Sequence, residues 1–229
     1  MKNNYKAMIF AAGRGERMRP LTDATPKPLL RLGDKRLIEY QLEALSRAGF
    51  ARVVINTAWQ GAQFEPALGD GRKYGLAIDY SHEGEALETV GGIVKAAPML
   101  GPEPFVTTSG DVYTDFDYGK LLPVLAHIAR GEIDAHFVLT RNPPFHAEGD
   151  FAIHQGFASR SGPRLNYSGI ACWHPKLFAG FVAGDKKKLF PWANALVDAR
   201  RVSAEHHAGI WENIGTPQQL DALDRKIRP

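Results

Sequence analysis

The sequence has little cysteine: one residue, Cys172, in a chain of 229, which excludes an internal disulfide and any metal site built on paired cysteines. It has no apolar run of roughly 18 residues, the length that a membrane-spanning helix needs, and residues 1–5 lack the apolar start of a signal peptide. The net charge is only +3, without an Arg-rich arm, so nucleic-acid binding gains no support. We therefore expect a cytoplasmic globular protein with no membrane and no nucleic-acid partner, and the sequence leaves its oligomeric state open.

Short apolar runs alternate with helical patterns along the first 140 residues. The runs predict strands at 7–12, 52–56, 76–81, 104–109 and 135–140. The intervening patterns predict helices at 37–48, 60–68, 91–100 and 118–129. This alternation favours a Rossmann-like α/β fold, a three-layer sandwich with a mostly parallel, mixed central sheet. In such sheets ligands bind at the carboxyl ends of the strands.

The rhythm changes after Arg141, where a Pro-rich polar stretch begins. Residues 151–158 and 165–173 look like strands, and further helices follow. The chain contains no repeat, low-complexity tract or flexible linker. We therefore expect one domain over residues 1–229, in which the part after 141 is a small insertion or lid.

A glycine-rich turn with cations, residues 11–20, follows the first predicted strand. No Gly-Lys-Ser/Thr closes it, so it is not a Walker A loop, and Met18 stands where a dinucleotide fingerprint needs its third glycine. Backbone N–H groups of the glycines and the neighbouring arginines suit a triphosphate. The glycines alone are explained equally well by a tight turn with surface arginines.

Two charged residues strengthen the functional interpretation. Lys27 stands between Pro26 and Pro28, which predicts a stiff, extended backbone that aims its ammonium at one phosphate. Asp111 follows the predicted strand 104–109, where a carboxylate can hold Mg²⁺ against phosphate oxygens. Because the glycine-rich turn and Asp111 both follow predicted strands, we expect them to share one crevice.

The stretches AAGRGERMRPLT and TPKPLL resemble the signature of the sugar-1-phosphate nucleotidyltransferases, and the resemblance extends over nearly the whole chain. It implies an enzyme that uses Mg²⁺ as cofactor, with a nucleoside triphosphate and a sugar 1-phosphate as substrates. It implies that Ala12 and Gly13 contact the nucleoside, that Gly15 and Arg17 bind the triphosphate, and that Lys27 contacts the reacting phosphates.

The same resemblance assigns three further segments. Residues 87–93 take the place of the family's base-recognition loop, which makes Gly91, and then Glu88, candidates for nucleotide binding; an ordinary helix start is the alternative. Asp111 takes the place of the metal-binding Gly-Asp, and joins Arg17 and Lys27 as a catalytic residue. The closing motif at 211–217 carries Asn213 where the family has an aspartate, so Asn213 is the candidate second metal ligand, without charge.

Within the family, residues 83–89, 110–115 and 142–151 most resemble the branch that transfers a uridylyl group from UTP to N-acetylmuramic acid 1-phosphate in peptidoglycan recycling. Residues 1–140 would then be mainly the nucleotide-binding half, and 141–229 the sugar-binding half with the C-terminal helices. Asp150 and Asn166 are the candidate sugar-binding residues.

Three alternatives remain. The first is another family member, a glucose-1-phosphate thymidylyl- or uridylyltransferase or a mannose-1-phosphate guanylyltransferase. The second is a non-catalytic nucleotide-sensing module, which would have no use for Lys27 and Asp111 together. The third, a Rossmann-type oxidoreductase, is disfavoured by Met18 and by the lack of a ribose-binding acid after the second predicted strand.

Overall fold

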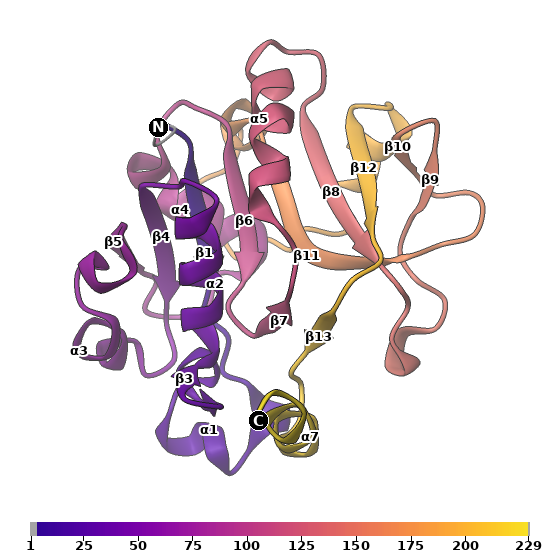
Figure 1. Cartoon of the computed structure of the whole chain (residues 1–229). Coiled ribbons are helices and arrows are strands. Elements are labelled where there is room, and N and C mark those ends of the chain that lie inside the picture. The colour runs from indigo at the N-terminus through magenta and orange to yellow at the C-terminus, as the bar shows by residue number, and fades with distance from the viewer. Residues whose placement is uncertain (1–3, 229) are drawn as a thin grey trace.

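A nine-stranded sheet runs through residues 4–228, the part of the chain that the computed structural model describes (Figure 1). Its strand order is β5-β4-β1-β6-β11-β8-β12-β10-β9. The strands are β1 (Lys6–Phe10), β4 (Arg52–Thr57), β5 (Ala77–His82), β6 (Phe105–Ser109), β8 (Ala135–Thr140), β9 (Ala152–His154), β10 (Phe157–Ser159), β11 (Asn166–Trp173) and β12 (Val202–His207). Two small pairs lie outside this sheet: β2 (Arg31–Leu32) with β3 (Lys35–Arg36), and β7 (Val112–Thr114) with β13 (Trp211–Asn213).

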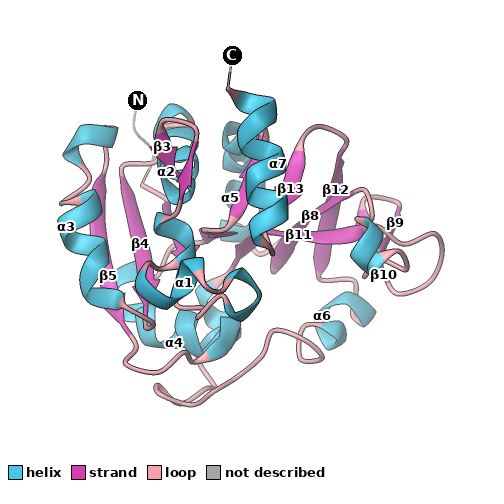
Figure 2. Cartoon of the chain, turned by 90° about the horizontal axis from the view of Figure 1, so that it is seen from below, coloured by secondary structure: helices cyan, strands magenta, loops and turns pink. Residues whose placement is uncertain are grey.

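Helices cover both faces of the sheet, as Figure 2 shows with α2 and α5 on one side and α4 and α6 on the other. Their bounds are α1 (Leu21–Ala24), α2 (Leu37–Arg47), α3 (Phe64–Leu68), α4 (Glu88–Leu100), α5 (Leu121–Ala129), α6 (Asn194–Asp198) and α7 (Pro217–Ile227). Successive strand residues point to opposite faces, so in β1 Ile9 packs in the core under α2 and α5 while Met8 packs in the core over α4. The apolar run of β1 is thus buried on both faces, and the mostly parallel mixed sheet of the prediction is confirmed.

The strand order of the sheet reverses at β1. β1 lies between β4 and β6 and runs parallel to both. The chain proceeds from β1 outward through β4 to β5, then returns to β6 on the other side of β1. Phe10 and Ser109, the last residues of β1 and β6, are register partners, so the segments that follow these strands begin side by side. This is the crevice position at which open α/β sheets bind ligands.

The strands and helices predicted for the first 140 residues are present, whereas α1, β2, β3 and β7 have no counterpart in the prediction. The second half differs in two places. The single strand expected over 151–158 is a hairpin, β9–β10, because Gln155 and Gly156 both take positive φ values, 51° and 79°. The helices expected after residue 173 are accompanied by β12, which pairs parallel to β8 inside the main sheet. The second half therefore adds strands to the sheet, as the salmon, orange and yellow arrows of Figure 1 show.

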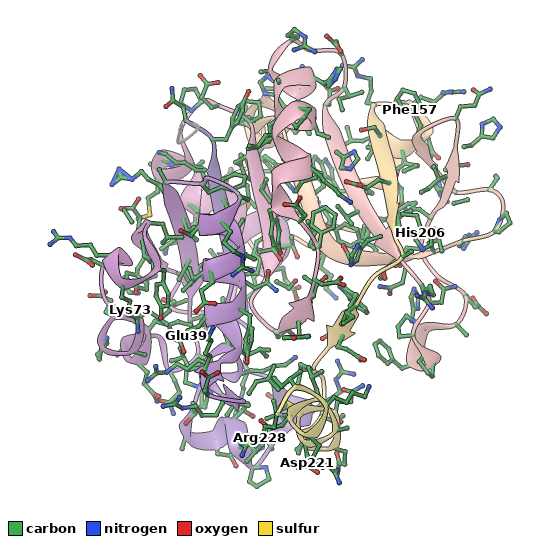
Figure 3. The ribbon with its side chains drawn as sticks, in the orientation of Figure 1. Glu39, Lys73, Phe157, His206, Asp221 and Arg228 are labelled. Atoms are coloured by element: carbon green, nitrogen blue, oxygen red, sulfur yellow. The ribbon has the colours of Figure 1, made fainter. Side chains whose placement is uncertain are left out.

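The C-terminal helix α7, which carries the labelled Asp221 in Figure 3, packs against the beginning of the chain. Its Leu223 shares an apolar cluster with Met18 and Leu32, and the N–H of Gly33 donates to Asp224 Oδ1 at 2.6 Å. The glycine-rich turn is thus supported by the opposite end of the chain. No helix within residues 4–228 is long and apolar enough to cross a membrane.

Candidate active site

A cavity of about 370 Å³ opens at the carboxyl ends of β1 and β6. This volume falls within the range of about 300–1,000 Å³ that is typical of small-molecule sites. Its walls come from the last residues of β1, β4 and β6 and from the segments after β1, β5 and β6. The lining residues are Phe10, Ala11, Ala12, Gly13, Gly15, Lys27, Pro28, Asn56, Glu83, Ala86, Glu88, Thr89, Ser109 and Asp111.

The glycine-rich turn forms one wall of the cavity. Its two lining glycines, Gly13 and Gly15, are explained by different features of the structure. Gly15 has φ +67°, and a Cβ added to it would lie 3.1 Å from Thr22 Cγ2 and 3.2 Å from Lys27 Cβ. The Thr22 hydroxyl donates to the Gly15 carbonyl at 2.9 Å, which fixes this left-handed turn. A Cβ on Gly13 would meet nothing within 4 Å, so Gly13 offers open backbone to whatever occupies the cavity.

Lys27 is 8% exposed and its ammonium forms an ion pair with the Asp111 carboxylate, whose side chain is 29% exposed. The extended backbone predicted for Lys27 is wrong: Lys27–Leu29 is a 3₁₀ turn between extended Pro26 and Leu30. The turn still holds the lysine rigidly, because the N–H of Leu30 donates to the Lys27 carbonyl at 3.1 Å. The glycine-rich turn and Asp111 share one cavity, as predicted, and the structure adds Lys27 to it as the partner of Asp111.

Asn213 lies in a segment whose backbone is hydrogen-bonded to the segment that carries Asp111. It ends β13, where it is the register partner of Val112, and the N–H of Ile214 donates to the carbonyl of Asp111 at 3.1 Å. Its Oδ1 atom is buried and has no hydrogen-bond partner within the described residues. A buried amide oxygen without a donor is available to a ligand or a cation.

Comparison with known proteins shows which family has this arrangement. Residues 6–147, which contain every residue that lines the cavity, match the family model described as nucleotidyl transferase. The chain is 46% identical over 220 residues to the N-acetylmuramate alpha-1-phosphate uridylyltransferase of Neisseria meningitidis serogroup B, covering 94% of this chain and 95% of that one. The chain belongs to the nucleotidyl transferase family.

Three further proteins that resemble this nucleotidyl transferase have lower identities. The mannose-1-phosphate guanylyltransferase catalytic subunit beta of Drosophila pseudoobscura is 38% identical over 95% of this chain, which spans 61% of that protein. A solved structure described as a putative glucose-1-phosphate thymidylyltransferase from Bacillus anthracis superposes with a TM-score of 0.82 at 20% identity, covering 98% and 97% of the two chains. HddC from Yersinia pseudotuberculosis, complexed with GMP-PN, gives 0.80 at 18% identity, covering 98% and 100%. These structures share the fold.

Arg17 of the nucleotidyl transferase is exposed on the 3₁₀ turn Glu16–Met18 and does not line the cavity. Its guanidinium lies against Gly215, where an added Cβ would be 3.3 Å from Nη2. This contact joins the glycine-rich turn to the segment that carries Asn213. Arg17 therefore lies outside the cavity, against the segment that carries the metal-ligand candidate.

The two residues predicted to bind the base are separated by the structure. Glu88 lines the cavity at the first position of α4, with φ +64°, a left-handed conformation that is rare for a residue with a side chain. Gly91 is buried within α4 and does not line the cavity. Its N–H donates to the Lys187 carbonyl at 3.2 Å, and an added Cβ would collide with the Asp185 carbonyl. Close packing against residues 185–187 thus accounts for this glycine.

Asp150 and Asn166, the predicted sugar-binding residues, lie at the same sheet edge but not in this cavity. Asn166 is buried and pairs with Thr140, the last residue of β8. Asp150 accepts from the N–H of Tyr167 at 2.7 Å and contacts His146 at 3.1 Å. It lines a second cavity of about 280 Å³, with Gly149, Phe151, Arg160, Arg164, Phe190 and Asn194.

Sequence reasoning missed two buried polar residues in the cavity wall, Asn56 and Glu83. Asn56 lies in β4 and Glu83 directly follows β5, and both are buried. Burial raises the pKa of the Glu83 carboxyl, against opposing contributions from the N–H of Leu87 and the amide of Asn56. The signal available in the sequence was that Asn56, a polar residue, directly follows the apolar run Val53–Ile55.

Proposed function

We propose that this nucleotidyl transferase transfers a uridylyl group from UTP to N-acetylmuramic acid 1-phosphate, releasing pyrophosphate and forming UDP-N-acetylmuramate. The choice of substrates is supported by the Neisseria relative, whose name states this activity and whose length the chain covers almost fully. The observation that carries the chemistry is the Lys27–Asp111 ion pair at the strand-end cavity, facing the backbone of Gly13 and Gly15. A cation and an acid in one cavity are what a triphosphate and its counterion require.

In the proposed reaction a phosphate oxygen of the sugar 1-phosphate attacks the α-phosphorus of UTP in line with the departing pyrophosphate. This oxygen is already ionised at neutral pH, so no general base is needed, and catalysis consists of alignment and charge neutralisation. The backbone N–H groups of residues 12–15 bind phosphate oxygens. Lys27 neutralises the charge that develops on the reacting phosphates, and Arg17 neutralises the leaving pyrophosphate.

The residues present fit Mg²⁺. Asp111 offers a carboxylate and Asn213 a buried amide oxygen that has no other partner, and magnesium prefers oxygen ligands. Within residues 4–228 no cluster of three His, Cys, Asp or Glu side chains could hold a metal by itself, so a metal here would depend on substrate phosphates for further ligands. Mg²⁺ held by these residues would supply positive charge against the phosphate oxygens.

We further propose that residues 1–140 bind mainly the nucleotide, with Ala12, Gly13 and Glu88 around the nucleoside, and that 141–229 bind mainly the sugar. Asn166 is the register partner of the last residue of β8, a strand parallel to β12 in the same sheet. Because β11 runs antiparallel to β6, its first residues reach the edge at which β6 ends. The sugar would therefore lie beside Asn166 and Asp150, next to the nucleotide cavity.

A matrix of nucleotides and sugars tests this proposal. UTP, dTTP, GTP, CTP and ATP are each mixed with N-acetylmuramic acid, N-acetylglucosamine, glucose and mannose 1-phosphates, and pyrophosphate release is followed. We expect the highest kcat/KM for UTP with N-acetylmuramic acid 1-phosphate. A preference for dTTP with glucose 1-phosphate, or for GTP with mannose 1-phosphate, would reassign the substrates. Nucleotide binding without pyrophosphate release from any pair would favour a sensing module.

A further inference from the structure

Two opposite walls of the nucleotide cavity are joined by a chain of buried hydrogen bonds. The N–H of Ala11, in the wall after β1, donates to Asn56 Oδ1 at 2.9 Å. The Asn56 amide donates to Glu83 Oε1 at 2.6 Å, and the N–H of Leu87, in the wall before α4, donates to Glu83 Oε2 at 2.8 Å. Two side chains thus connect the backbones of two loops that are far apart in the sequence.

These hydrogen bonds are largely shielded from solvent, which does not favour a charge. Asn56 is 2% and Glu83 8% exposed, and no ion pair within the described residues includes the Glu83 carboxylate. Lys95 donates to the backbone carbonyl of Glu83 at 3.4 Å rather than to its carboxylate. Burying a carboxylate without an ion pair lowers stability. Glu83 is therefore better explained by what it holds in place than by the stability it adds.

Helix α4 encloses the pair from the side away from the cavity. A Cβ added to Gly92 would lie 2.8 Å from Glu83 Oε1 and 2.9 Å from the Asn56 amide nitrogen. Any larger residue at position 92 would push the two side chains apart or toward the cavity that both of them line. The glycine leaves room for the pair to form and fixes where it stands.

We propose that Asn56 and Glu83 are a positioning pair that sets the distance between the Ala11–Gly15 wall and the Ala86–Thr89 wall, so that the gap fits the planar base of a nucleoside triphosphate. The proposal rests on the proposed nucleotide-binding function of this cavity. The pair acts through the two backbones, at Ala11 N and Leu87 N, because each N–H is held by one of its members.

Because each hydrogen bond has a defined donor and acceptor, the pair can be tested by exchanging the amide and the carboxylate between positions 56 and 83. In Glu83→Gln, the new amide group must face either the Asn56 amide or the Leu87 N–H, so two donors meet. In Asn56→Asp, two carboxylates meet in a buried site. In the double variant, the new carboxylate at position 56 accepts from Ala11 N and from the new amide at position 83, whose oxygen accepts from Leu87 N. All three hydrogen bonds are then restored, and the one between positions 56 and 83 runs in the opposite direction.

UTP affinity is measured by isothermal titration calorimetry without a sugar phosphate, beside the thermal stability of each variant. We expect each single variant, and Gly92→Ala, to bind UTP at least tenfold more weakly, and the double variant to return within about threefold of the native protein. The control is Glu39→Gln, another buried carboxylate (labelled in Figure 3), which accepts from Tyr74 and from the N–H of Arg36 and does not line the cavity. It should lose stability while keeping native UTP affinity.

Native affinity in both single variants would overturn the proposal. So would a double variant that binds UTP as weakly as the single variants, whether or not its stability recovers, because the carboxylate of Glu83 would then be needed for itself. Gly92→Ala keeps the test decisive if a single variant does not fold, since it displaces the pair without changing its polarity. If the native protein does not bind UTP at all, it is the proposed function that fails.

Discussion

The ammonium of Lys27 pairs with the carboxylate of Asp111, although 84 positions separate the two residues. Lys27 lies in the connection between β1 and β2, and Asp111 lies two residues after the end of β6. The pair places a cation and an anion at the switch point of the sheet. A triphosphate and its counterion can then exchange these partners without moving the backbone, which is the preorganisation that electrostatic catalysis requires.

Removing either member of this pair should abolish most of the activity. We predict that Lys27→Ala and Asp111→Asn lower kcat by about 100- to 1,000-fold, the usual cost of losing one preorganised charge interaction. Circular dichroism should show an unchanged fold. Lys35→Ala is the matched control, because Lys35 forms an ion pair with Glu43 at 2.8 Å outside the cavity. Near-native turnover in either site variant would show that its role is assigned wrongly.

The amide at position 213 should set the metal affinity. Asn213→Asp adds a charged ligand, so the Mg²⁺ concentration that half-saturates UTP binding should fall by roughly tenfold, whereas Asn213→Ala should raise it. Calorimetric titration of UTP at several Mg²⁺ concentrations measures this without turnover. Glu212→Gln, which changes the neighbouring residue and its ion pair with Lys226 at 3.5 Å, should leave the magnesium dependence unchanged. Identical titrations for the native protein and both Asn213 variants would exclude Asn213 as a ligand.

The two glycines of the turn should respond differently to a methyl group. Gly13→Ala meets nothing within 4 Å and should keep native stability while weakening UTP binding, since the methyl enters the cavity. Gly15→Ala forces a side chain into a φ of +67° beside Thr22 and Lys27, and should lower the free energy of unfolding by about 1–2 kcal/mol. Urea unfolding and UTP titration separate the two effects. A loss of stability in Gly13→Ala would contradict the open geometry of this turn.

Asp134 gives the fold a defined pH dependence. Hydrogen bonds from Arg201 at 2.8 and 2.9 Å, and then from Lys176, lower the pKa of Asp134 from 3.8 to about 2. A lowered pKa means that the stabilisation is present above the unfolded value of 3.8 and is lost as the pH falls towards 2. Asp134→Asn should therefore cost at most about 2 kcal/mol at pH 7, and the difference should shrink between about pH 4 and pH 2.

Urea unfolding across this pH range measures the effect, with Asp198→Asn as its control. Asp198 pairs with Arg160 at 2.8 Å, but both side chains are more than half exposed, at 55% and 52%. An exposed pair of this kind contributes only about 0–1 kcal/mol. A pH-independent loss of stability in Asp134→Asn would show that packing, not charge, holds this position.

The sequence was sufficient to predict the parts of the site that depend on local rules. The glycine-rich turn and Asp111 follow apolar runs, and strand ends of a parallel sheet meet at one edge, so their meeting could be derived before any coordinates. The backbone of Lys27 could not, because flanking prolines permit both an extended chain and the 3₁₀ turn that Leu30 N closes. Lys27 lines the cavity, but the extended conformation predicted for it was wrong.

Residues that are explained by contacts with distant parts of the sequence could not be predicted. Gly91 is explained by the backbone of residues 185–187, and the Asn56–Glu83 link by the junction of β4 with the loop after β5. β12 carries charged and polar residues at alternate positions, and its place in the sheet is set by β8, which no local pattern reveals. Such positions require the tertiary structure.

The proposed function is tested most directly by internal competition. UTP and Mg²⁺ are supplied with an equimolar mixture of N-acetylmuramic acid, N-acetylglucosamine and glucose 1-phosphates, and the nucleotide sugars formed at low conversion are quantified by mass spectrometry. Their ratio equals the ratio of the kcat/KM values. We predict that UDP-N-acetylmuramate exceeds each other product at least tenfold, and a mixture dominated by either of the other UDP-sugars would contradict the proposed substrate.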